Sequence, residues 1–119
     1  MPKTSKDYFP NQIRLGHFVL TIKLLDSEII LNLGEQQGSF EAREQTIYLD
    51  RDIIAGNPDR AINLIIHELM HAIYNQYNLN KESTEEDIVN AMSNGITELL
   101  TRTDLNKWIE HKLKEVKNV

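Results

Sequence analysis

The chain has 119 residues, which is enough for one domain and too few for two. It contains no cysteine, so disulfides and thiolate metal sites are excluded, and any metal must be held by His, Asp or Glu. The formal net charge is -5 and no Lys/Arg cluster stands out, so we expect no nucleic-acid partner. No run of about 18 apolar residues is present, so we expect no membrane association and a cytoplasmic protein.

The predicted strands come first along the chain. Residues 1–11 are polar and contain two prolines, so we expect a flexible arm before a single domain at 12–119. Residues 13–25 alternate between apolar and polar positions in the manner of a half-buried strand. Shorter strands are predicted at 29–33 and within the segment QTIYLDRDI, and a helix is an option for the preceding EAREQ.

Three helices are predicted to follow the strands. The segment GNPDR begins the first, because Asn57 can cap it and Pro58 suits its first turn, and apolar spacing continues to about Tyr77. The second begins at Ser83 or Thr84, and the third follows the break TRTD. Strands followed by helices predict an α+β fold. We expect a small, mostly antiparallel sheet of about three strands that packs on the first helix, with two further helices completing the core.

The first helix contains the motif HELMH. His67 and His71 are four residues apart, so a helix stacks their imidazoles on one face, where both can bind one tetrahedral zinc ion. Glu68 follows the first histidine and would lie beside the ion, where a carboxylate can take a proton from zinc-bound water. This HExxH pattern predicts Glu68 as the general base of a catalytic zinc site.

Two alternatives concern the metal. Without any metal, the two histidines of this helix would simply hydrogen-bond to carbonyl groups of the core. A shuffled chain of this composition contains HExxH with a chance of roughly 1%, which makes a metal site the stronger interpretation. The second alternative keeps the site but fills it with iron or manganese, which also bind two histidines and a carboxylate.

A catalytic zinc site needs a third protein ligand and an open position for water. The second helix follows a short loop and can fold back on the first, so its first-turn acids are the best candidates, and we favour Glu86 over Glu85. Asn90 would then support a ligand histidine through a hydrogen bond. The competing interpretation is a capping box, in which Glu86 accepts from the Ser83 amide. The remaining candidates for the third ligand are His17, His111 and Asp87.

Residues 46–100 resemble the short gluzincin-type metallopeptidases of phages and mobile elements, the ImmA/IrrE-like group. The resemblance is carried by the segments QTIYLDRDI, AINLIIHELMHAIYN and EEDIVNAMSNGITELL. It implies that zinc is bound by His67, His71 and Glu86, and that the general base is Glu68.

Two further features follow from this resemblance. Many gluzincins have an aspartate four residues after the ligand glutamate, and this chain has Asn90 there, whose amide can accept the same hydrogen bond without adding charge. In that family the strand before the HExxH helix often pairs with an extended substrate, so the segment TIYLD is a candidate substrate edge.

The sequence therefore predicts a zinc metallopeptidase that acts on a peptide or protein, such as a repressor or host protein, in the host cytoplasm if a phage encodes it. Amide hydrolysis also needs a group that stabilises the oxyanion. Candidates for this role are Tyr74, Tyr77, Tyr48, His17 and His111. The alternative function is a non-catalytic zincin-like domain, in which structural zinc supports a surface that binds a host or repressor protein.

Overall fold

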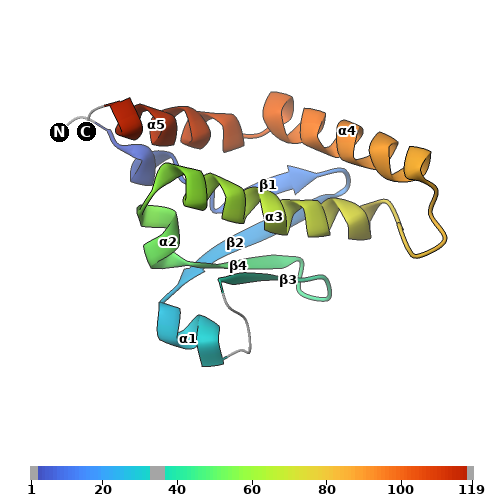
Figure 1. The fold of residues 1–119 in the computed structure, drawn as a ribbon, viewed down its shortest axis with the longest axis horizontal. Helices are drawn as coiled ribbons and strands as arrows, with labels where there is room; N and C mark the ends of the chain where they lie inside the picture. The colour runs from blue at the N-terminus through green and yellow to red at the C-terminus, as the bar shows by residue number, and fades with distance from the viewer. Residues whose placement is uncertain (1–2, 33–36, 118–119) are drawn as a thin grey trace.

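The computed structural model describes residues 3–32 and 37–117 and has an α+β fold, as predicted. Its sheet has four strands, β1 (Gln12–Leu15), β2 (Phe18–Leu25), β3 (Gly38–Glu41) and β4 (Thr46–Asp50), in the order β1-β2-β4-β3. Helix α3 (Pro58–Gln76) crosses the sheet, and α4 (Glu85–Arg102) and α5 (Leu105–Lys117) lie beside it (Figure 1). Two short helices, α1 (Ser27–Asn32) and α2 (Arg51–Ala55), flank β4.

The sheet is mixed, and two of its three strand pairings are antiparallel, so the prediction of a mostly antiparallel sheet of about three strands is roughly matched. Strands β1 and β2 form an antiparallel hairpin, β3 and β4 pair antiparallel, and β2 pairs with β4 in parallel. The predicted single strand at 13–25 is this hairpin, because Gly16 has a φ of 62° and turns the chain between Leu15 and Phe18. The segment EAREQ, for which a helix was an option, is the last residue of β3 followed by a turn in which Gln45 adopts a φ of 51°.

Alternation along the strands separates a buried face from an open one. The side chains on the buried face pack against the helices, and they are Ile13, Leu15, Leu20, Ile22, Ile47 and Leu49. Arg14, Val19 and Lys23, one position out of phase, are exposed. The core therefore lies between the sheet and the layer of α3 to α5.

Helix α1 replaces the strand predicted at 29–33, of which residue 33 lies outside the described part of the chain. The Asp26 carbonyl accepts hydrogen bonds from the amides of Ile29 and Ile30, which starts the helix, and the Ile30 side chain is fully buried. Burial of this one side chain outweighs the strand preference of β-branched residues.

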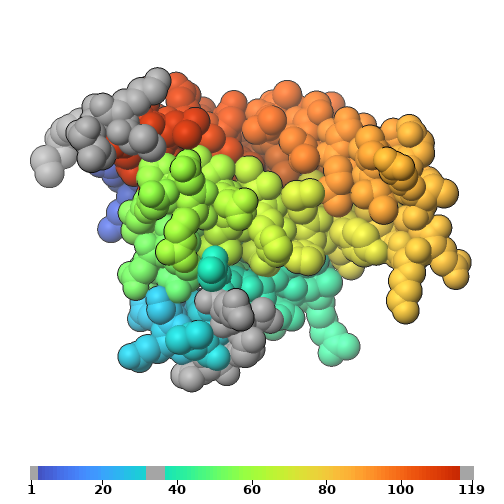
Figure 2. Space-filling model, viewed as in Figure 1, coloured from blue at the N-terminus to red at the C-terminus, as the bar shows by residue number. Residues whose placement is uncertain are grey.

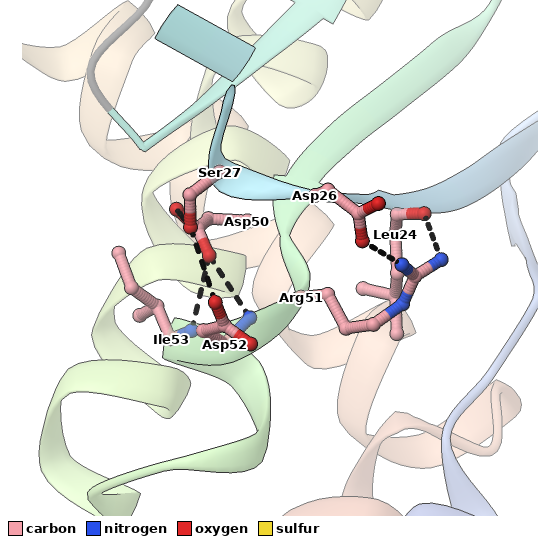
Figure 3. Close-up of polar contacts among 7 residues, drawn as sticks. All are labelled: Leu24, Asp26, Ser27, Asp50, Arg51, Asp52 and Ile53. Atoms are coloured by element: carbon pink, nitrogen blue, oxygen red, sulfur yellow. Dashed lines mark hydrogen bonds and ion pairs between the residues drawn. The ribbon is translucent and has the colours of Figure 1, made fainter. Parts of the chain in front are cut away.

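The junction between β4 and α2 is fixed by a polar network (Figure 3). Asp50 ends the strand and caps α2, accepting hydrogen bonds from the amides of Asp52 at 2.9 Å and Ile53 at 3.3 Å. Its other oxygen accepts from the Ser27 hydroxyl at 2.7 Å. Arg51 pairs with Asp26 and donates to the Leu24 carbonyl at 2.9 Å. These contacts tie the start of α1 to the point where the chain turns toward α3.

The three long helices begin close to the predicted residues. Asn57 caps α3 by accepting from the amides of Asp59 and Arg60, with Pro58 in the first turn. Thr84 caps α4, and α5 begins at Leu105. None of the described helices is long and apolar enough to cross a membrane.

The N-terminal segment differs from the predicted flexible arm, because the part from Ser5 onward packs on α5. Residues Ser5–Tyr8 form a short 3-10 helix, and the Ser5 hydroxyl donates to Glu115. The Tyr8 ring stacks on His111 with centroids 3.8 Å apart. These contacts make residues 5–8 part of the same packed unit as α5.

Candidate metal centre

Helix α3 places the two motif histidines on its exposed side. Its other side faces the core through a continuous buried stripe, formed by Ala61, Leu64, Ile65, Glu68, Leu69, Ala72 and Ile73. His67 and His71 lie next to this stripe, one turn apart, and their ring centroids are 4.9 Å apart at an interplanar angle of 76°. The prediction that helical spacing brings the two imidazoles together is confirmed.

Glu68 belongs to the buried stripe, although it carries a carboxylate. The residue is only 5% exposed, whereas the neighbouring His67 side chain is 63% exposed. The Glu68 Oε1 atom lies 3.9 Å from His67 Nε2. One potential ligand atom from each of Glu68 and the two histidines lies within 4.8 Å of the others, which is close enough for a single ion to reach all three.

This cluster forms one wall of an open groove of about 780 Å³ between α3 and β3. The surfaces of α3 and of the hairpin that contains β3 adjoin on the face of the molecule shown in Figure 2. From α3 the lining residues are Asn63, Leu64, His67, Glu68, His71 and Asn75. From the strand side they are Gln37, Gly38, Ser39, Phe40, Glu41 and Ala42.

The strand beside the groove is β3, which corrects the prediction that TIYLD provides a substrate edge. That segment is β4, which lies between β2 and β3, so both of its edges already carry hydrogen bonds. Strand β3 is the last in the order and pairs on its outer edge with no other strand of the described residues. Its short segment Gly38–Glu41 gave too weak a strand pattern to be recognised in the sequence.

The structure does not bring Glu86 to the histidines. Within the described residues, the cluster of potential ligands contains Glu68 and the two histidines, without Glu85 or Glu86. Gly95 of α4 packs against Ile73 of α3, and Glu86 lies nine residues before Gly95. Nine residues correspond to about 13 Å along a helix, so Glu86 lies near the start of α4, and this start extends past the C-terminal end of α3 (Figure 1).

The first turn of α4 is capped differently from the predicted box of Ser83 and Glu86. Thr84 Oγ1 accepts from the Asp87 amide at 3.1 Å, and Asp87 accepts from the Thr84 amide at 3.0 Å. The hydrogen bond from the Thr84 backbone lowers the pKa of Asp87 below its ordinary value. Asn90 lies near Asp87 on a surface next to Tyr77 and away from the groove.

The other candidate residues lie outside the groove lining. His17 is in the exposed turn between β1 and β2, and His111 is stacked on Tyr8. Tyr74 is 39% exposed. Tyr48 donates to Glu44 at 2.6 Å, and this hydrogen bond, with burial and the charge of Glu44, raises the pKa of Tyr48.

Sequence reasoning missed Asn63 and Asn75, which line the groove at either end of the motif. A signal was present, because both asparagines follow the four-residue spacing of the histidines. Comparisons with protein-family models, with curated proteins and with solved structures found no match for this chain. The likeness to gluzincins thus stays a prediction from the sequence.

Proposed function

We propose that the chain is a zinc-dependent metallopeptidase. The observation that carries the proposal is the position of the cluster: two imidazoles and a buried carboxylate, within 4.8 Å of one another, line a groove. The groove is bordered by the outer edge of β3, which pairs with no other strand of the described residues. An extended peptide can pair with such an edge and pass in front of the cluster. The arrangement combines a place for a peptide with a place for a metal ion.

The two histidines supply two of the three protein ligands that a catalytic zinc site needs. His67 and His71 offer imidazole nitrogens on the exposed side of α3, and these are preferred zinc ligands. When bound, zinc would supply a water of lowered pKa and polarise the carbonyl group of a peptide bond. Iron or manganese would suit the same donors, so the identity of the metal is part of the test.

Glu68 is proposed as the general base. Burial holds its carboxylate beside His67 in the wall of the groove, where it could take a proton from a water molecule bound there. The same carboxyl group would then pass that proton to the leaving amine. A role in proton transfer needs the negative charge of Glu68, whereas its packing needs only its shape.

The experiment replaces Glu68 by glutamine, which keeps the shape and removes the charge. Zinc content and cleavage of an unfolded protein substrate are measured for the purified wild type and E68Q. We expect hydrolysis to fall about 100-fold to 10000-fold, the usual contribution of a general base, while zinc binding is retained. The matched control is E110Q, because Glu110 is exposed on α5 and outside the groove lining.

Two results would contradict this role. Hydrolysis by E68Q at the wild-type rate would exclude Glu68 as the base. Loss of zinc from E68Q would instead identify Glu68 as a ligand, which its distance from the histidine nitrogens also permits.

A further inference from the structure

A line of four polar side chains runs along the wall of the groove. Asn63, His67, His71 and Asn75 follow one another at intervals of four residues on α3, and all four line the groove opposite β3. Residues at this spacing form a continuous row on a helix, inclined by about 26° to its axis. The metal-binding pair therefore lies in the middle of the row, with one amide at each end.

The two asparagines are not required by the fold. Both are exposed, and within the described residues neither side-chain amide has a hydrogen-bond partner. This differs from Asn57 and Asn80, whose side chains accept from backbone amides at the ends of loops. Asparagine is also a poorer helix former than alanine, so helix stability gives no reason for either residue.

The length of the row matches an extended peptide. Asn63 and Asn75 are twelve residues apart, which corresponds to about 18 Å along the helix. An extended chain advances about 3.4 Å per residue, so this span holds about five residues. A substrate lying along the groove would place its central peptide bond beside the histidines and its flanking peptide groups beside the asparagines.

The chemistry of the two asparagine side chains also suits an extended peptide. An asparagine amide carries a carbonyl acceptor and an NH₂ donor, which complement the N–H and C=O of a peptide group. The edge of β3 offers the same kind of backbone pairing on the opposite side of the groove. Hydrogen bonds from both sides of the groove would recognise the main chain of a substrate, with little selection for its side chains.

We propose that Asn63 and Asn75 are substrate-binding residues that hold an extended segment of about five residues across the metal centre by its main chain. The inference rests on the proposed peptidase function and adds a substrate class to it. That class is an unfolded or loop segment with little sequence preference, because a folded helix or sheet has already used its backbone groups.

The test compares N63A, N75A and the control N94A. Asn94 is an exposed asparagine in the middle of α4, outside the groove lining, so the same substitution is made in the same kind of helix. The probes are blocked, fluorescent peptides of alternating serine and leucine, two and six residues long. Binding is measured on the zinc-loaded E68Q background, and KM and kcat are measured with Glu68 in place.

We expect N63A and N75A each to weaken binding of the six-residue peptide about fivefold to tenfold, the effect of one lost hydrogen bond. KM should rise by a similar factor with kcat nearly unchanged, and N94A should match its parent. The two-residue peptide cannot reach either end of the row, so its binding should be the same in all variants.

Two failures are distinguishable. If the parent protein cleaves the six-residue peptide and the N63A and N75A variants bind it as tightly as the parent does, the inference is overturned while the peptidase function stands. If the zinc-loaded parent neither binds nor cleaves any peptide, the proposed function fails and this inference fails with it.

Discussion

Gly95 is a point of close contact between α4 and α3. A Cβ atom added there would lie 2.7 Å from Ile73 Cγ1 and Cδ1 and 2.9 Å from Ile73 Cγ2. Ile73 is fully buried, so it cannot move aside without disturbing the core. We expect G95A to lower the free energy of unfolding by about 1 kcal/mol, because overpacking of 1–3 kcal/mol exceeds the roughly 1 kcal/mol gained from helix propensity.

The matched background for this prediction is I73A, in which the obstructing side chain is removed. There the added methyl group has room, so G95A should raise the free energy of unfolding measured by urea denaturation. A destabilisation of equal size in both backgrounds would show that the contact with Ile73 is not its cause.

For individual residues, the sequence was sufficient to predict that the two histidines lie together, and insufficient to predict a third metal ligand. His67 and His71 lie on one helix, so local geometry alone brings their rings to 4.9 Å. The position of Glu86 depends on how far α4 is shifted along α3, and in this structure Gly95 lies against Ile73. A non-local register of this kind has no short-range signal in the sequence.

Helix α5 and the N-terminal segment are joined by a contact that depends on pH. The Glu115 carboxylate accepts from the Ser5 hydroxyl and lies 3.3 Å from the ammonium group of the buried Lys112. Burial raises the pKa of Glu115, but the hydrogen bond from Ser5 and the charge of Lys112 outweigh it and lower the pKa below 4.5. Its contribution to stability is therefore present above pH 4.5 and is lost as the pH falls through the lowered value.

Replacing Ser5 by alanine should therefore cost about 1 kcal/mol of unfolding free energy at pH 7, and this cost should shrink in acid as Glu115 becomes protonated. Urea denaturation at several pH values measures both parts. The control S93A removes an exposed serine from α4, and its effect should not depend on pH. A cost for S5A that is the same at every pH would argue against the carboxylate as its partner.

Helices were predicted correctly where the capping residues and the apolar spacing indicate the same element. Asn57 and Pro58 mark the start of α3, and its buried stripe follows the apolar pattern of the sequence. Helix α1 was mistaken for a strand, because its two isoleucines favour a strand locally and only the burial of Ile30 decides otherwise. The hairpin of β1 and β2 was also missed, although Gly16 marks its turn.

Most of the buried core lies outside the lining of the groove, which the core reaches through Leu64. Its largest buried side chains include Trp108, Ile47, Leu49 and Ile65, and it joins the sheet to all three long helices. We therefore expect the fold to remain compact without a metal ion. In the alternative function zinc is structural, and the fold would then require the ion.

Chelation separates these two functions. We expect the protein without metal to keep its helical circular dichroism signal and a cooperative thermal transition, lowered only by the loss of a bound ligand. Peptidase activity should disappear and return when zinc is added. Unfolding of the chain on removal of the metal would favour the structural role instead.

For the molecule as a whole, the fold class could be predicted from the sequence, but the pairing and order of the strands could not. The order of strands before helices was enough for α+β. The parallel pairing of β2 with β4, and the position of β3 at the edge, join segments that are distant along the chain. The location of the groove depends on that pairing, so it was not accessible from local patterns.

The central claim is that His67 and His71 hold one metal ion at this groove, and zinc titration calorimetry tests it most directly. We predict one ion per wild-type chain, a loss of affinity of at least about 100-fold in H67A and in H71A, and affinity close to the wild-type value in E86Q. Wild-type protein that binds no zinc, or histidine variants that bind it as tightly as the wild type, would contradict the account.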